Sequence, residues 1–64
     1  MPWSEESSAR LTEVIRGLEQ LEAEQRRGAG GARAAAIEAQ LGELEAERQR
    51  LLQQMYAAFA ARHG

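Results

Sequence analysis

Four hydroxyl side chains and one histidine are the groups in this chain that resemble a nucleophile and its base. The hydroxyls, Ser4, Ser7, Ser8 and Thr12, cluster near the N-terminus, and His63 is the penultimate residue. A serine and a histidine need a third group that orients the imidazole, and the chain contains no aspartate for the usual triad. Because both ends of a short helical chain tend to fray, we expect no nucleophilic catalysis.

The glutamates and glycines also lack the spacing of a metal or phosphate site. Glu43, Glu45 and Glu47 point in different directions around a helix, and the Glu-x-x-His spacing of di-iron bundles is missing. There is no cysteine, so His63 is the only ligand other than oxygen that a structural metal would favour. The GAGG segment lacks the Lys-Ser/Thr pair that completes a phosphate loop. The sequence therefore predicts a protein that is not an enzyme and has no cofactor, metal or small-molecule site.

Three arginines surround the glycine-rich segment RRGAGGAR. Arg26, Arg27 and Arg33 would form a small basic tip, able to contact phosphates or an acidic protein surface. No aromatic side chain lies nearby to stack on bases, and arginines at the end of a helix commonly offset its dipole. We keep a nucleic-acid-binding hairpin dimer that uses this tip as the alternative function.

The C-terminal segment MYAAFAARHG is apolar nearly all round and holds Met55, Tyr56 and Phe59. A chain reversal at the glycines would bring Trp3 close to the two aromatic residues. Two interpretations are open: this end packs against Trp3 or a sister subunit, or it docks as a helix in a groove of another protein. Trp3, Met55, Tyr56 and Phe59 are the predicted partner-binding residues.

Two helices are expected to position these residues. The chain is rich in arginine, glutamate, alanine, leucine and glutamine, which favour helix. Apolar residues recur every three or four positions on both sides of the glycines, namely Leu11, Val14, Ile15, Leu18 and Leu21 before them, and Ile37, Leu41, Leu44, Leu51, Leu52, Met55 and Phe59 after them. The sequence predicts an all-α fold in a single domain, residues 1–64, with a helix at 4–27 capped near Ser4, a turn at 28–31 and a helix at 32–62.

A turn this short makes the helices antiparallel, so the expected architecture is a coiled-coil-like two-helix hairpin. A chain of 64 residues buries a small fraction of its surface, and no disulfide compensates. Two helices alone also cannot enclose their own apolar seam. We therefore expect self-association or a partner protein to complete the hairpin as a bundle, for example a four-helix bundle.

Two charged residues interrupt the predicted apolar stripes. At about 100° per residue, Arg48 projects into the middle of the second stripe and Glu22 beside the centre of the first. Either their charged groups reach water while their methylenes cover apolar surface, or the two residues form pairs that fix register and oligomeric state. Within one hairpin they lie roughly 16 Å apart along the axis, so such a pair needs a second copy or a partner.

The remaining charges are predicted to form a solvated outer face. Glutamate and arginine recur there three or four residues apart, at Glu6–Arg10, Glu13–Arg16, Glu22–Arg26 and Glu47–Arg50. Each such pair stabilises a helix by about 0.2–0.5 kcal/mol. The formal net charge of −2 provides no field that attracts nucleic acid or an anionic membrane.

In its topology the expected hairpin resembles four-helix-bundle dimers of the Rop type, which bind RNA, and the hairpin co-chaperones of type III secretion. The resemblance implies an adaptor, co-chaperone or regulator, and no residue role is transferred from either group. The chain has no apolar run of about 18 residues, and its N-terminus is polar and acidic. We expect a cytoplasmic protein that forms a homodimer or binds a larger protein and has no contact with a membrane.

Overall fold

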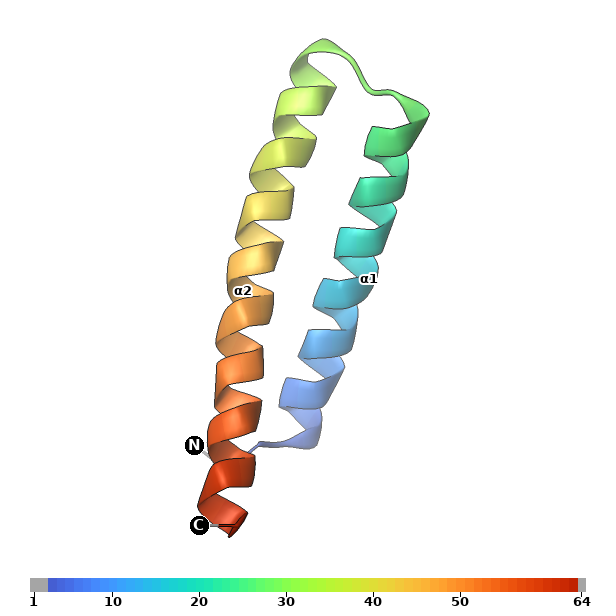
Figure 1. Ribbon diagram of the computed structural model, residues 1–64. Coiled ribbons are helices and arrows are strands. Elements are labelled where there is room, and N and C mark those ends of the chain that lie inside the picture. The colour runs from blue at the N-terminus through green and yellow to red at the C-terminus, as the bar shows by residue number, and fades with distance from the viewer. Residues whose placement is uncertain (1–2, 64) are drawn as a thin grey trace.

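The structure is a computed structural model that describes the backbone of residues 3–63 and the side chains of residues 3–62. Over this range the chain forms two helices, α1 (Glu5–Arg27) and α2 (Gly31–His63), which run antiparallel and pack against each other (Figure 1). The start of α1 and the end of α2 lie at the same end of a rod that measures 49 × 15 × 15 Å. The predicted all-α helical hairpin is confirmed, and its completion to a bundle stays a prediction.

Ser4 begins α1 as its N-cap. Its backbone is extended, with φ −120° and ψ 168°, and its Oγ accepts a hydrogen bond from the Ser7 N–H at 3.1 Å. Glu5 and Glu6 follow in the first turn, where carboxylates interact favourably with the unpaired N–H groups of the helix start. The helix proper therefore starts one residue after Ser4.

The glycine-rich segment ends α1 and reverses the chain. Gly28 has a φ of 92°, a conformation that side chains with a Cβ rarely adopt, and its N–H donates to the Gln25 carbonyl at 3.2 Å. Gly31 also has a positive φ, 56°, and begins α2 one residue before the predicted start. Arg26 and Arg27 occupy the last turn of α1, where cations complement the helix dipole.

A short apolar core lies between the helices. Val14 and Leu18 of α1 and Ile37 of α2 are fully buried. Half-buried side chains extend this seam along the rod, namely Leu11, Leu21, Leu41, Leu44, Leu51, Leu52 and Met55. Gly17 permits a close approach of the helices, because a Cβ at this position would lie 3.2 Å from the Cδ1 atom of Leu44. Neither helix within the described residues is long and apolar enough to cross a membrane.

Candidate interaction surface

Two ion pairs join the helices along one side of the hairpin. Arg10 of α1 binds Glu47 of α2 through Nε to Oε2 at 2.5 Å and Nη2 to Oε1 at 2.6 Å. Nearer the turn, Arg33 of α2 binds Glu24 of α1 with the same atoms at 2.5 and 2.6 Å. Each arginine therefore presents two N–H donors to both oxygens of one carboxylate, which fixes the relative position of the helices better than a single contact would.

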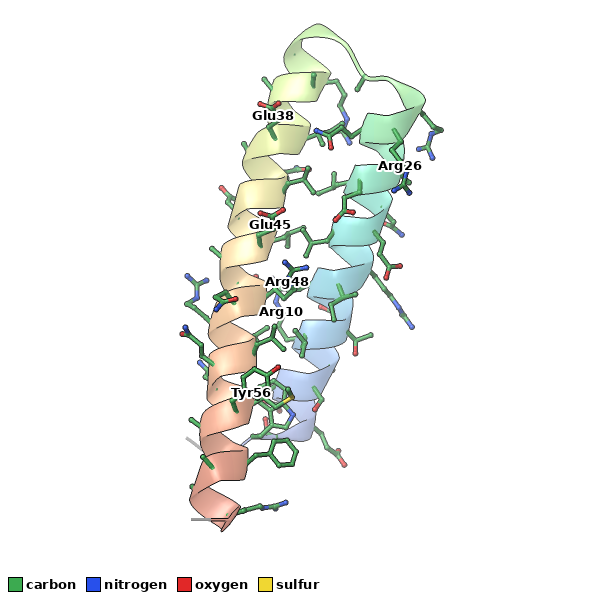
Figure 2. The ribbon with its side chains drawn as sticks, viewed as in Figure 1. Arg10, Arg26, Glu38, Glu45, Arg48 and Tyr56 are labelled. Carbon is green, nitrogen blue, oxygen red and sulfur yellow. The ribbon has the colours of Figure 1, made fainter. Side chains whose placement is uncertain are left out.

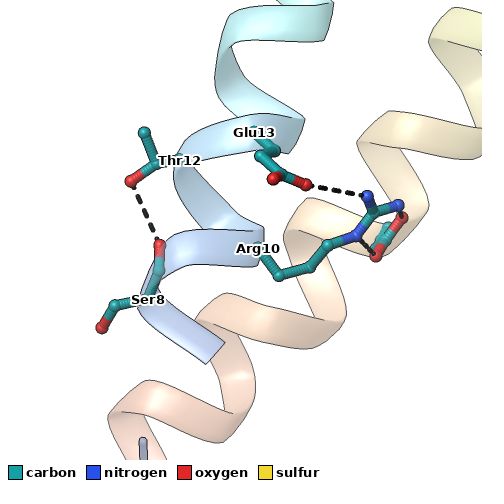
Figure 3. Close-up of polar contacts among 5 residues, drawn as sticks. Ser8, Arg10, Thr12 and Glu13 are labelled. Atoms are coloured by element: carbon teal, nitrogen blue, oxygen red, sulfur yellow. Dashed lines mark hydrogen bonds and ion pairs between the residues drawn. The ribbon is translucent and has the colours of Figure 1, made fainter. Parts of the chain in front are cut away.

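Arg10 also contacts Glu13, one turn along its own helix, at 3.4 Å (Figure 3). The hydrogen bonds from Arg10 lower the pKa of Glu47 below its ordinary value, and those from Arg33 lower the pKa of Glu24. The same bonds raise the pKa of Arg10 and of Arg33. All four groups are therefore charged at neutral pH, and two ion pairs join the helices on this side of the hairpin.

These contacts correct the predicted charge pattern. The sequence suggested pairs within each helix, whereas the ion pairs of the described chain are Arg10–Glu13, Arg10–Glu47 and Arg33–Glu24. Glu47 does not pair with Arg50 on the outer face, because it lies half-buried beside the seam and is reached by Arg10. The sequence held a signal for this: Glu47 follows Leu44 by three positions and precedes Leu51 by four, so it flanks the stripe.

The opposite side of the hairpin exposes large apolar side chains. Ile15 is 39 % exposed, Tyr56 64 % and Phe59 49 %. The sequence placed Ile15 and Phe59 within the predicted apolar stripes, but the partner helix covers only the centre of each stripe. These side chains are left out of the seam, so this side of the hairpin exposes three large apolar side chains among charged ones.

Helical geometry shows that these residues share one side. At about 100° per residue, Arg10 lies about 40° to one side of Val14, and Ile15 lies about 60° to the other side of Leu18. In α2, measured from Ile37, Glu47 lies about 80° to one side, whereas Tyr56 and Phe59 lie about 100° and 40° to the other. Arg10 and Glu47 bind each other, so they lie on the same side of the hairpin. Ile15 of α1 and the two aromatic residues of α2, Tyr56 and Phe59, therefore share the opposite side. We call the side formed by Leu11, Ile15, Leu52, Tyr56 and Phe59 the open face.

Glu22 and Arg48, the predicted register residues, both lie on or beside the open face. Glu22 lies about 40° from Leu18 on the side of Ile15, and Arg48 about 20° from Ile37 on the side of Tyr56. Both are exposed, and neither forms an ion pair within the described chain. Figure 2 shows Arg48 and Tyr56 on the same side of α2 as Glu38 and Glu45. Arg48 is thus at the seam position that the sequence indicated, but its side chain is not buried.

Comparisons with protein-family models, with curated proteins and with solved structures found no match to this chain. The candidate site therefore rests on the geometry of the hairpin itself.

The other predicted partner-binding residues differ from Tyr56 and Phe59 in exposure. Met55 is half-buried, since it lies on the seam side of α2. Trp3 is also half-buried, and its Nε1–H donates to the Oγ atom of Ser8 at 2.6 Å. Tyr56 and Phe59 are therefore the members of this group that are most accessible to a partner.

The basic tip holds fewer free cations than the sequence suggested. Arg26 and Arg27 are exposed, but both nitrogens of Arg33 that face Glu24 are engaged by its carboxylate. Arg33 therefore belongs to the ion-paired side of the hairpin. The pairing of Arg33 with Glu24 could not be predicted from the sequence, because it depends on the path of the chain through the turn.

The hydroxyl groups of the N-terminal segment form local hydrogen bonds. Ser4 caps α1, and its Oγ lies 3.1 Å from the Oγ of Ser7. Thr12 donates to the Ser8 carbonyl at 3.1 Å (Figure 3). The side chain of His63 lies outside the described residues, and within those residues no three histidine or carboxylate side chains gather where they could hold a metal.

Proposed function

We propose that this protein is a small non-catalytic interaction module, an adaptor, co-chaperone or regulator, that binds protein through the open face of its hairpin. The observation that carries the proposal is the one-sided exposure of Ile15, Tyr56 and Phe59 opposite the two cross-helix ion pairs. Burial of apolar surface provides about 25 cal/mol per Å². A two-helix seam has no room for these side chains, so only another molecule can cover them.

The rod shape leaves a large surface accessible to a partner. A compact monomer of 7.1 kDa exposes about 4,100 Å². This chain exposes 4,907 Å², because it is a rod.

Nucleic-acid binding through the basic tip has weaker support. The pairing of Arg33 with Glu24 leaves Arg26 and Arg27 as the free cations of the predicted tip. Two phosphate contacts give a small salt-dependent affinity, and the net charge of −2 opposes approach to a polyanion. A protein partner therefore fits these residues better.

A photo-crosslinking experiment in cells that express the full chain tests the proposal. Benzoylphenylalanine replaces Tyr56 on the open face, or Gln20, which is exposed on the outer side of α1. We expect many protein adducts from the Tyr56 position and few from the Gln20 position. When cells are lysed and irradiated with or without added salt, the yield of adducts from the Tyr56 position should change little. Equal yields at both positions, or nucleic acid as the main adduct, would refute the proposal.

A further inference from the structure

We infer that the open face binds a cationic amphipathic helix of another protein, whose arginine or lysine side chains lie beside Glu22, Glu38 and Glu45. The inference rests on the proposed function and gives the chemistry of its partner. Three observations carry it: the excess of unpaired glutamates on this side of the hairpin, their position along the rod, and the apolar residues that both helices expose beside them.

The side of the open face carries more carboxylates than guanidinium groups. Four glutamates and two arginines lie within about 100° of the seam on this side, namely Glu19, Glu22, Arg26, Glu38, Glu45 and Arg48. All six are exposed, and none forms an ion pair within the residues that the structure describes. The open face therefore has a net negative charge, which a positively charged partner complements.

The glutamates occupy one part of the rod and the aromatic residues another. The two cross-helix ion pairs place Glu38 level with Glu19, and Glu45 level with Thr12. The acidic part of the open face thus extends from the middle of α1 toward the turn, whereas Tyr56 lies near the opposite end of the rod (Figure 2). A matching partner carries its positive charge toward one end of its contact surface.

Three of these glutamates are close neighbours. Glu38 lies level with Glu19, and Glu22 follows Glu19 by about one turn of helix. Like charges at such spacings are unfavourable in the isolated hairpin. Arg26 lies one turn beyond Glu22 but does not pair with it in the described chain. A cationic side chain of a partner, placed among the three carboxylates, would replace repulsion with charge-assisted hydrogen bonds.

A second copy of this chain would not supply the missing positive charge. In an antiparallel dimer that brings Glu22 level with the other copy's Arg48, Glu45 comes level with the other copy's Glu38. In a parallel dimer every glutamate lies level with its own counterpart. Both arrangements bring carboxylates together, so the charges favour a different, basic protein.

The apolar residues favour a helix as the binding segment. A third helix lying along the open face would contact α1 and α2 at once and cover Ile15, Leu52 and Phe59, which completes the hairpin as a three-helix bundle. From the level of Glu22 to Tyr56 the rod extends roughly 30 Å, the length of a helix of about 20 residues. Exposed ion pairs contribute little affinity, so the apolar contacts hold the partner and the glutamates select its charge.

Charge reversal tests the inference in cells that express the full chain with benzoylphenylalanine in place of Tyr56. Mass spectrometry identifies the protein segment attached to the benzophenone. We expect a segment with apolar residues at helical spacing and a net positive charge. Glu38→Arg should lower the adduct yield about tenfold, because repulsion replaces attraction. Glu43→Arg, the same charge change on the outer side of α2, is the matched control and should leave the yield unchanged.

Thermal unfolding separates a change at the interface from damage to the fold. Glu38→Arg removes one of three neighbouring carboxylates, so the melting temperature of the hairpin should not fall. Glu22→Arg makes the same charge change on the other helix and should lower the adduct yield similarly. Both variants are therefore expected to lose the partner while they keep their helical structure.

Two synthetic peptides test the charge preference with the purified chain. Both are helical, have about 20 residues and share one stripe of leucines, and they carry either arginine or glutamate beside that stripe over one half. Fluorescence anisotropy should give a dissociation constant about tenfold lower for the arginine peptide. Glu38→Arg should remove this preference, and Glu43→Arg should retain it.

Several results would overturn the cationic partner. They are a Tyr56 adduct with an acidic segment or with a second copy of this chain, equal effects of Glu38→Arg and Glu43→Arg, and failure of the purified chain to prefer the arginine peptide. An adduct with an acidic segment of another protein would still support the proposed function. The absence of any protein adduct from the Tyr56 position would refute the proposed function itself.

Discussion

Replacement of Gly17 with alanine tests how closely the two helices approach. Glycine is about 0.8–1.0 kcal/mol less favourable than alanine inside a helix, so the new methyl group should stabilise α1 by that amount at an open site. At Gly17, however, the Cβ would lie 3.2 Å from Leu44 Cδ1. Leu44 must then shift by a few tenths of an ångström, and a strained side-chain rotamer costs about 0.5–1.5 kcal/mol. We therefore expect the gain at Gly17 to be cancelled.

Gly42 provides the matched control, because a Cβ there would have no neighbour within 4 Å. Gly42→Ala should stabilise the chain by about 1 kcal/mol. In a domain of this size such a change raises the melting temperature by about 4–8 °C. Thermal unfolding followed by circular dichroism, at one protein concentration for all variants, measures both substitutions.

A double-mutant cycle assigns the difference between the two glycines to Leu44. In a Leu44→Ala background the Cδ1 atom is gone, so Gly17→Ala should regain the full stabilisation seen at Gly42. If Gly17→Ala stabilises the wild-type chain as much as Gly42→Ala does, the helices do not approach as described. The same conclusion follows if Leu44→Ala leaves the effect of Gly17→Ala unchanged.

Three further predictions concern the turn and the ion pairs. Gly28→Ala should lower the free energy of unfolding by about 1–2 kcal/mol, because Gly28 has a φ of 92°, whereas Gly30→Ala should have little effect in urea denaturation. Arg10→Glu should destabilise the hairpin by placing like charges together, and adding Glu47→Arg should restore most of the lost stability; no recovery would contradict the observed pair. The pKa values of Glu24 and Glu47 are lowered in the folded chain. The stability that these two ionised carboxylates add to the fold is therefore complete above the ordinary glutamate range, about pH 4–5. It is lost as the pH falls through and below that range. Thermal unfolding between neutral and acidic pH measures this loss, which should be smaller in the Arg10→Glu variant.

The elements of this fold could be predicted from the sequence because their signals are local. Ser4 provides a cap for the first helix, and Gly28 has the backbone freedom to end it. The apolar stripes predicted from the sequence contain Val14, Leu18 and Ile37, which are the residues that the structure buries. These features depend on neighbours within a few turns of helix.

The two flanks of the seam could not be predicted in the same way. Ile15 and Glu47 both lie at the edge of a stripe, and helical projection alone does not show whether the partner helix covers that edge. The structure exposes Ile15 and brings Glu47 to Arg10. The pairing of Arg33 with Glu24 likewise depends on the path of the turn. The difference between the ion-paired side and the open face is thus a property of the packed hairpin rather than of either helix.

Photo-crosslinking from the Tyr56 position in two single-charge variants tests most directly whether the open face is an interface. Ile15→Arg places a charge on the open face, and Gln20→Arg places the same charge on the outer side of α1. We predict that the chain without either substitution forms protein adducts, that Ile15→Arg abolishes them and that Gln20→Arg leaves their yield intact. The absence of adducts from the unsubstituted chain, or equal effects of the two substitutions, would contradict binding through the open face.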